Sequence, residues 1–208
     1  MVSAILLGAG ESKRMGRNKL SLPWGEKTIF EHCLRTLLRS DVQEVIVVLS
    51  HRIGWMGDQW RDQKVKVVNN PYSKMGMSTS IRRGLQAIDP SSGGILIALG
   101  DQPLIKTRTI NALIHAFVQG RGAIVVPSFR GKLGHPVIFH HRYLKELLKL
   151  RGDVGGRSII EKHPEEVWLV HVKSEGVMKD IDTREDYHPH QPISPHQVGR
   201  KKGRKKKR

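Results

Sequence analysis

Short apolar runs rich in β-branched residues alternate along the chain with segments of helical periodicity. The runs predict strands at residues 2–7, 44–49, 64–68, 94–99, 123–127 and 136–140. The apolar spacing between them predicts helices at residues 28–40, 77–88, 107–118, 142–150 and 156–163. Continuous apolar strands separated by helices indicate a mostly parallel sheet that is covered on both faces. The predicted fold class is therefore α/β, with a single doubly wound sheet.

Two glycine-containing turns follow predicted strands at the same edge of that sheet. Gly8-Ala9-Gly10 comes after the first strand, and Gly100-Asp101 comes after the fourth. Ligands of open α/β sheets bind beyond the carboxyl ends of the strands. One ligand is therefore expected to touch both turns.

The loop after the first strand has the composition of a polyanion site. Its cations stand within seven positions, at Lys13, Arg14, Arg17 and Lys19. Glycines in the same loop let backbone N–H groups converge on one point. The loop is neither a Walker loop, which needs Lys-Ser/Thr after its last glycine, nor a dinucleotide fingerprint, which needs glycine at position 13. A tight strand-to-helix turn with solvated charges is the alternative interpretation.

Length and composition fit one domain. The 208 residues are 38% hydrophobic, enough for a sizeable core. Cys33, the single cysteine, excludes an internal disulfide and a cysteine-cluster metal site, and its apolar helical setting predicts a packed core thiol. No apolar run reaches the length of a membrane span, and the chain enters its first strand without a charged leader. We therefore expect a cytoplasmic protein with no membrane partner.

The net charge of +17 is unevenly distributed. Residues 200–208 carry eight Lys and Arg, so the remainder of the chain carries +9. Residues 188–197 are too rich in proline and polar side chains to pack. We expect a folded domain over residues 1–187 and a disordered basic tail over 188–208. The tail either binds nucleic acid or an acidic partner through its charges, or is a solubilising extension without a dedicated ligand.

The glycine loop carries a family resemblance. The pattern Leu-x-Ala-Gly-x-Ser-x-Arg-Met-Gly-x-x-Lys over residues 7–19 resembles the opening signature of the MobA-like nucleotidyltransferases, whose fold is Rossmann-like. In that family the loop folds over the nucleotide. The resemblance implies nucleotide contacts by Leu7, Gly8, Ala9 and Gly10. It also implies that Arg14 and Lys19 hold the triphosphate and act in catalysis.

A candidate metal ligand follows the fourth strand. Asp101 lies at a strand's carboxyl end opposite the cationic loop, and Mg²⁺ prefers one or two carboxylates together with phosphate oxygens and water. A capping role on the helix expected near Thr107 is excluded by the distance along the chain. The tetrapeptide Gly-Asp-Gln-Pro resembles the metal-binding motif of molybdenum-cofactor nucleotidyltransferases, especially the cytidylyltransferase branch. The resemblance thus implies Mg²⁺ as cofactor and a catalytic role for Asp101.

A second acidic motif lies near the end of the expected domain. Residues 180–187 resemble the family's closing Asp-x-Asp-Thr-Pro-Glu-Asp motif, with Arg184 in place of the proline. One of its first two aspartates completes the metal site in the family, and Asp182 is favoured by its place beside Thr183. Alternatively, Asp182 or Thr183 caps a terminal helix that has Asp186 in its first turn.

Three further segments resemble parts of the family's cleft. Asn69, Ser78 and Ser80 stand where the family lines the base and ribose, although helix capping explains the serines as well. His135 and Arg157 belong to Gly-x-Pro and Gly-Asp-x-Gly motifs of the acceptor half, where they suit a pterin or its phosphate. A core histidine is the alternative for His135.

The resemblance covers residues 3–187 and implies a reaction. A nucleoside monophosphate passes from an NTP to a phosphate-bearing acceptor, with release of pyrophosphate. Ala9 together with the Gly-Asp-Gln-Pro motif resembles the branch that uses CTP, which implies a molybdopterin-type acceptor and delivery to a xanthine-dehydrogenase-type hydroxylase. A guanylyltransferase or a sugar-phosphate nucleotidyltransferase remains an alternative. From another class, a nucleic-acid-binding accessory protein without catalysis would rely on the basic tail.

Overall fold

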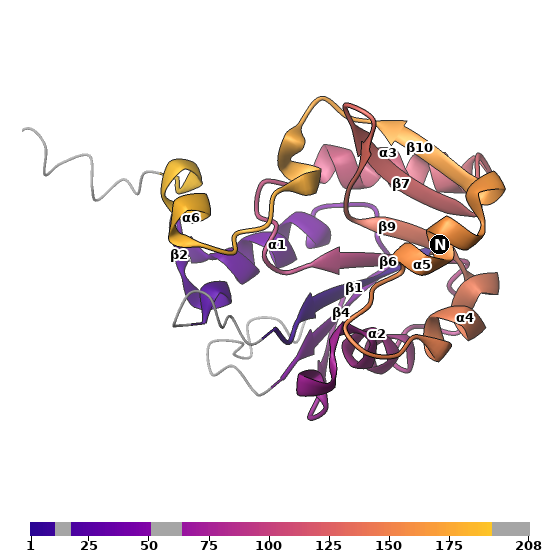
Figure 1. Cartoon of the computed structure of the whole chain (residues 1–208), viewed down its shortest axis with the longest axis horizontal. Coiled ribbons are helices and arrows are strands. Elements are labelled where there is room, and N and C mark those ends of the chain that lie inside the picture. Colours follow the sequence, from indigo (N-terminus) through magenta and orange to yellow (C-terminus); the bar gives the residue numbers. More distant parts are fainter. Residues whose placement is uncertain (11–17, 51–63, 193–208) are drawn as a thin grey trace, which may run out of the picture.

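The computed structural model describes residues 1–10, 18–50 and 64–192. One sheet runs through the molecule in the order β10-β7-β9-β6-β1-β4-β5 (Figure 1). Its strands are β1 (Val2–Gly8), β4 (Glu44–Leu49), β5 (Val65–Asn69), β6 (Gly94–Leu99), β7 (Ile124–Phe129), β9 (Val137–His140) and β10 (Val167–His171). Among the strands of the described residues, only β9 runs antiparallel to both of its sheet neighbours, and a short β8 (Lys132–Leu133) also pairs antiparallel with β7. The sheet is mostly parallel, as predicted.

Helices cover both faces of this sheet. Helices α1 (Ile29–Leu38) and α3 (Thr107–Val118) pack on one face. Helices α2 (Met77–Leu85), α4 (Leu144–Lys149) and α5 (Arg157–Lys162) pack on the other. The doubly wound α/β class is therefore confirmed. None of the described helices has both the length and the apolar content needed to cross a membrane.

Strand β1 is apolar at every position except Ser3. All of its residues are buried. Ala4 and Leu6 point into the core beneath α1 and α3, whereas Ile5 and Leu7 point into the core beneath α2. Successive side chains of a strand face opposite sides. A strand covered on both faces is therefore apolar on both sides, which is the pattern that identified it in the sequence, and its one polar side chain, Ser3, is hydrogen-bonded to Glu44.

Helix α1 begins with a capping box. The Thr28 hydroxyl accepts from the Glu31 backbone N–H, and the Glu31 carboxylate accepts from the Thr28 backbone N–H. One face of the helix, including Phe30 and Cys33, is buried in the core. Burial raises the pKa of the Cys33 thiol. The expectation of a packed core thiol is confirmed.

Strand β10 was not predicted. It is an edge strand that pairs only with β7, and Trp168 and Leu169 are exposed. Acidic residues precede it and Lys173 follows shortly after it. It therefore lacks the buried setting that the sequence pattern recognises most readily.

A third, smaller core joins the C-terminal segment to the start of α1. Its buried members are Leu22, Trp24, Ile29, Ile181 and Tyr187. Trp24 belongs to the hairpin of β2 (Pro23–Trp24) and β3 (Lys27–Thr28), and Tyr187 belongs to α6 (Arg184–His190), which lies beside β2 in Figure 1. Helix α6 runs past the boundary expected at residue 187, so residues 188–190 are a correction to the predicted tail. Residues 193–208 lie outside the described part of the chain.

Candidate active site

The two glycine turns meet at the carboxyl ends of β1 and β6. The Gly100 backbone N–H donates to the Leu7 carbonyl at 2.9 Å. The ring of Phe30 packs beneath both turns: a Cβ atom at Gly8 would lie 2.4 Å from its Cε2, and one at Gly100 would lie 2.5 Å from its Cδ2. Close approach to one aromatic ring therefore requires glycine at both positions. The expected meeting of the two motifs is present.

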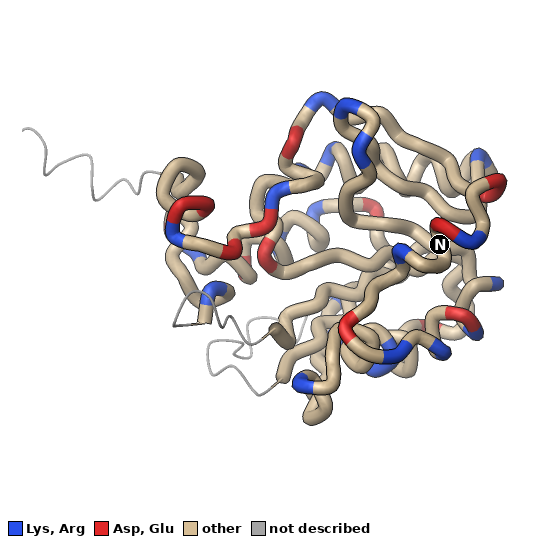
Figure 2. Tube along the Cα trace, in the orientation of Figure 1, with Lys and Arg blue, Asp and Glu red and all other residues tan. Residues whose placement is uncertain are grey.

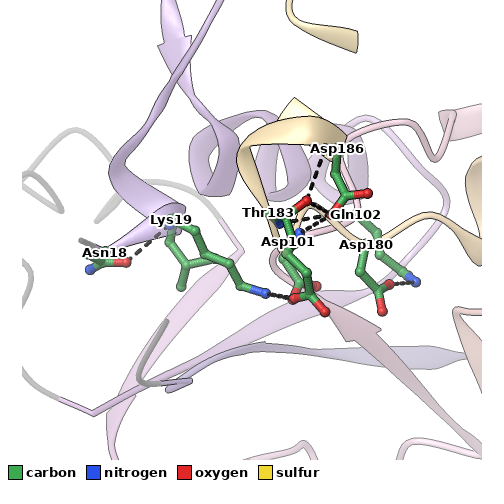
Figure 3. Close-up of polar contacts among 9 residues, drawn as sticks. Asn18, Lys19, Asp101, Gln102, Asp180, Thr183 and Asp186 are labelled. Atoms are coloured by element: carbon green, nitrogen blue, oxygen red, sulfur yellow. Dashed lines mark hydrogen bonds and ion pairs between the residues drawn. The ribbon is translucent and has the colours of Figure 1, made fainter. Parts of the chain in front are cut away.

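Lys19 bridges two aspartates at this edge. Its Nζ donates to Asp101 Oδ2 at 2.5 Å (Figure 3) and to Asp182 Oδ1 at 2.6 Å. The backbone around Lys19 is a short 3₁₀ turn, in which Asn18 Oδ1 accepts from the Leu20 N–H at 3.1 Å. Burial by itself would lower the pKa of Lys19, but the charges and hydrogen bonds of the two carboxylates outweigh it and raise the pKa above its ordinary value.

Asp182 reaches the site because the C-terminal segment is anchored on both sides of it. The Ile181 N–H donates to the Asp101 carbonyl at 2.9 Å, and the Ile181 side chain is fully buried. Thr183 caps α6 in a capping box with Asp186 (Figure 3). The helix-capping role considered for Asp182 thus falls to Thr183. The Asp182 carboxylate contacts Lys19 instead.

Asp180 adds a third carboxylate to the same cavity wall. Gln102 Nε2 donates to Asp180 Oδ1 at 2.6 Å. Partial desolvation and the nearby negative charge of Asp101 raise the pKa of Asp180. In the described part of the chain, Asp101 Oδ1 is buried without a hydrogen-bond partner. The site therefore has carboxylate oxygens to offer to a cation.

A cavity of about 710 Å³ opens beside these aspartates, a size that fits a nucleotide. Eight of the predicted site residues line it: Leu7, Gly8, Ala9, Gly10, Lys19, Ser80, Asp101 and Asp182. Sequence reasoning missed Lys74, Asp153 and Asp180 as lining residues. Asp180 belongs to a motif that was recognised, whereas Lys74 stands in a segment without one. Arg14 lies outside the described residues.

Asn69 and Ser78 do not line this cavity. Asn69 ends β5 and is exposed, and the side chain that turns inward is that of Asn70, which is fully buried. Asn70 Nδ2 donates to Thr79 Oγ1 and to Ser80 Oγ, both at 2.9 Å. The amide of Asn70 thereby orients Ser80 at the cavity. Nucleotide contacts by Asn69 and Ser78 stay predictions.

The N-terminus of α2 is held by a distant loop. Its Ncap residue is Gly76 at φ 104°, and no side chain of the helix caps it. Instead, the Met77 N–H donates to Asp153 Oδ1 at 3.1 Å and the Ser78 N–H donates to the Gly152 carbonyl at 3.2 Å. A Cβ atom at Gly76 would lie 2.3 Å from the Gly152 carbonyl carbon. The loop after α4 is therefore packed directly on the start of α2.

A second cavity of about 410 Å³ contains both predicted acceptor residues, His135 and Arg157, together with Lys132. Its walls are mainly apolar: Ile81, Ile97, Val126, Val137, Phe139 and Ile160. Met77 and Leu99 line both cavities, so the two are neighbours. His135 is half-buried, and burial lowers its pKa although the negative charge of Asp101 opposes the shift. His135 is thus a wall residue of a cavity rather than a fully buried core histidine.

Charged positions of the described residues are dispersed. In the view of Figure 2, Lys and Arg are scattered among loops and helices, with acidic positions between them. A nucleic-acid-binding surface characteristically gathers basic residues on one face or along one helix. The dispersed arrangement in this view favours the small-molecule site over the nucleic-acid alternative for the folded part.

Comparison with known proteins identifies the class of protein. The chain is similar to a solved nucleotidyl transferase from Methanothermobacter, with a TM-score of 0.77 over 96% of this chain and 99% of that one, at 24% identity. Residues 4–167 match the family model of the MobA-like NTP transferase domain. The chain belongs to this family.

Its curated relatives include proteins with different names. The chain is 29% identical to the purine catabolism protein PucB of Bacillus subtilis, covering 88% of this chain and 92% of PucB. It is 28% identical to nicotine blue oxidoreductase of Paenarthrobacter nicotinovorans, over 88% and 93%. It is 23% identical to the molybdenum cofactor cytidylyltransferase of Escherichia coli, over 89% and 93%.

A solved mycobacterial structure is also similar. The protein Rv0371c of Mycobacterium tuberculosis matches with a TM-score of 0.78 and 26% identity, covering 91% of this chain and 96% of that one. Another structure of Rv0371c, in complex with manganese, matches with a TM-score of 0.74 at 25% identity.

Proposed function

We propose that this protein transfers CMP from CTP to the terminal phosphate of a molybdopterin-type acceptor and releases pyrophosphate. The observation that carries the proposal is the bridge from Lys19 to Asp101 and Asp182 at the wall of a nucleotide-sized cavity. A second cavity with basic residues adjoins the first. In this proposal the first cavity takes the nucleotide and the second takes the acceptor, with Met77 in the wall of both.

The residues fit a divalent metal ion. Asp101 and Asp182 supply carboxylate oxygens, and the buried Asp101 Oδ1 has no partner in the described part of the chain. The described residues contain no cluster of three or more His, Cys, Asp or Glu able to hold a metal by itself. Mg²⁺ suits such a site because it takes one or two carboxylates and completes its shell with substrate phosphates and water. When bound, Mg²⁺ would neutralise charge on the phosphate oxygens.

In the proposed reaction, the acceptor phosphate attacks the α-phosphorus of CTP in line. The new P–O bond forms as the bond to pyrophosphate breaks, so no protein nucleophile is needed. Lys19 and Arg14 would bind the phosphates of the leaving group and stabilise its growing negative charge. The walls of the two cavities hold the reactants in the orientation needed for the attack.

The choice of base is proposed from one side chain. Ala9 lines the first cavity and is only 7% exposed, so its methyl group would take up space beside a nucleotide bound there. We propose that this methyl group disfavours the larger purine. The name of the Escherichia coli relative, a molybdenum cofactor cytidylyltransferase, supports CTP and the molybdopterin acceptor.

The acceptor is proposed from the second cavity. Its apolar walls suit a flat ring system, and His135, Arg157 and Lys132 suit a phosphate. The product would then serve a molybdenum hydroxylase of the xanthine-dehydrogenase type. We propose that the protein itself works in the cytoplasm.

The test is product analysis with purified protein, Mg²⁺, each NTP in turn and molybdenum cofactor. We expect a cytosine dinucleotide of the cofactor and one pyrophosphate for each dinucleotide. Faster turnover with GTP would show that the protein is a guanylyltransferase instead. Turnover only with sugar phosphates would show that the acceptor is a sugar phosphate and not a molybdopterin. The absence of pyrophosphate release with every acceptor would favour a non-catalytic role.

A further inference from the structure

Lys19 occupies the place between the two carboxylates that the proposed function gives to the metal. Its Nζ lies 2.5 Å from Asp101 Oδ2 and 2.6 Å from Asp182 Oδ1. Mg²⁺ binds carboxylate oxygens at about 2.1 Å, so an ion bridging these two oxygens would overlap the ammonium group. The ammonium and the metal cannot hold the same pair of oxygens together.

We propose that Lys19 is a cationic placeholder for the metal–nucleotide complex. It draws Asp101 and Asp182 together while no nucleotide is bound, and its side chain moves to the triphosphate when that complex enters. This inference rests on the proposed function and adds to it an order of events: metal and nucleotide enter the site together, because a metal ion that takes Asp101 Oδ2 and Asp182 Oδ1 must first displace Lys19.

The need for a placeholder follows from charge. Asp101, Asp180 and Asp182 all line the same cavity, and like charges this close repel one another. The Lys19 side chain, only 12% exposed, provides a compensating positive charge at two of them. Without a cation between them, the mutual repulsion of Asp101 and Asp182 would oppose the packing that holds their two segments together.

The structure also allows the movement. The backbone of Lys19 is fixed in a 3₁₀ turn capped by Asn18, whereas its side chain is a flexible stem with a compact charge at the end. A triphosphate offers this ammonium a more negative partner than the aspartates do. By linkage, a nucleotide that removes Lys19 from the carboxylates must raise the affinity for metal by the factor by which metal raises the affinity for nucleotide.

The test measures Mn²⁺ binding to nucleotide-free protein by electron paramagnetic resonance of the unbound ion. We expect Lys19→Ala to bind Mn²⁺ at least about 5-fold more tightly than the wild type, the lower end of usual coupling between ligands. The same variant should bind CTP more weakly. Opposite changes in the two affinities distinguish a placeholder from a structural residue, whose loss would weaken both.

Lys74→Ala is the matched control. Lys74 lines the same cavity and carries the same charge, but it is exposed and has no ion pair with the aspartates. Its removal should change Mn²⁺ affinity by less than about 3-fold, because solvent screens an exposed charge. Equal tightening in both variants would show a general charge effect and overturn the proposal.

Two further variants locate the effect. Lys19→Gln, which keeps most of the length of the side chain but removes its charge, should reproduce the tightening if Lys19→Ala perturbs the fold. Adding Asp101→Asn to Lys19→Ala should abolish the tighter binding of Mn²⁺. If Asp101→Asn weakens Mn²⁺ binding but neither Lys19 variant tightens it, the metal site stands and the placeholder is wrong. If Asp101→Asn has no effect with or without CTP, the proposed metal site falls as well.

Discussion

The Tyr187 hydroxyl donates to the Pro23 carbonyl, joining residues 164 positions apart in the chain. Tyr187 lies in α6, five residues after Asp182, and Pro23 lies in the hairpin that follows Lys19. The hydrogen bond and the small core around it therefore connect the two segments that bring a carboxylate and an ammonium together. The last helix of the fold is a structural support of the candidate active site.

Tyr187→Phe and Tyr187→Ala separate the two parts of this support. Phenylalanine keeps the ring and should cost about 1 kcal/mol of unfolding free energy through the lost hydrogen bond. Alanine also removes the buried ring and should cost about 3–5 kcal/mol. Because Asp182 depends on this packing, transfer should fall far more in the alanine variant. Urea unfolding and pyrophosphate release measure the two effects, and equal activity in both variants would contradict the supporting role.

Asp101→Asn should lower transfer by about 10²-fold or more while leaving the fold intact, because it removes one charged element from a preorganised site. Asp182→Asn should have an effect of the same kind. Asp180→Asn is the matched control, since Asp180 lines the same cavity but bonds Gln102 instead of Lys19. Pyrophosphate release at saturating CTP is the measurement. A larger loss in Asp180→Asn than in Asp182→Asn would exchange their proposed roles.

Local patterns explain which parts of the site were predictable. The strands before Gly8 and Asp101 are continuous apolar runs, so both turns could be placed at one sheet edge from the sequence. By contrast, Asp153 reaches the start of α2 from 76 residues away, and nothing near Met77 signals that contact. Such a partner is set by tertiary packing and has no periodic signature.

The neighbouring asparagines show a finer limit. Sequence reasoning placed Asn69 at the nucleotide, whereas the buried side chain that contacts Ser80 is that of Asn70. The expected strand ended at residue 68, and β5 ends one residue later. Successive side chains of an extended chain point to opposite sides, so only one of two neighbouring asparagines can face inward. The motif alone therefore did not decide which of the two asparagines faces inward.

CTP should be turned over faster than GTP, and Ala9→Gly should narrow the difference without reversing it. The methyl group of Ala9 is almost fully buried at the cavity wall, so its loss should change discrimination by about 1–3 kcal/mol at most. The ratio of kcat/KM for the two nucleotides measures this. Gly8 is unsuitable for the same test, because any side chain there would collide with Phe30. An unchanged ratio in Ala9→Gly would remove Ala9 from base selection.

Glu44 should make the fold sensitive to acid. It is buried at the opposite end of β4 from the site, where Ser3, Lys66 and the Asp89 backbone N–H contact its carboxylate. Burial by itself would raise the pKa of Glu44, but these partners outweigh it and lower the pKa. The resulting stabilisation is complete above the ordinary glutamate pKa of about 4.3 and is lost as the pH falls through the lower value of the folded state.

Urea unfolding between neutral pH and pH 3 tests the direction in which the contribution of Glu44 to stability changes with pH. Glu44→Gln should be less stable than the wild type at neutral pH, and the difference should shrink below about pH 4.3. Asp89, whose pKa is also lowered, remains in both proteins and so does not affect the comparison. Glu26→Gln, at an exposed position in the β2–β3 hairpin, is the control and should lack this pH dependence. A difference that grows as the pH falls would contradict the assignment to Glu44.

Removal of residues 193–208 should leave nucleotidyl transfer nearly intact and abolish most salt-sensitive binding to nucleic acid or acidic proteins. Eight Lys and Arg leave with this segment, and counterion release makes such binding fall steeply with salt. The cut belongs after Pro192, because α6 extends to His190 and supports the site through Tyr187. A second truncation from residue 184, which removes α6, should lose both stability and transfer. Fluorescence anisotropy with a labelled oligonucleotide at several salt concentrations measures binding, and pyrophosphate release measures transfer. Loss of transfer in the shorter deletion would make residues 193–208 part of the active site.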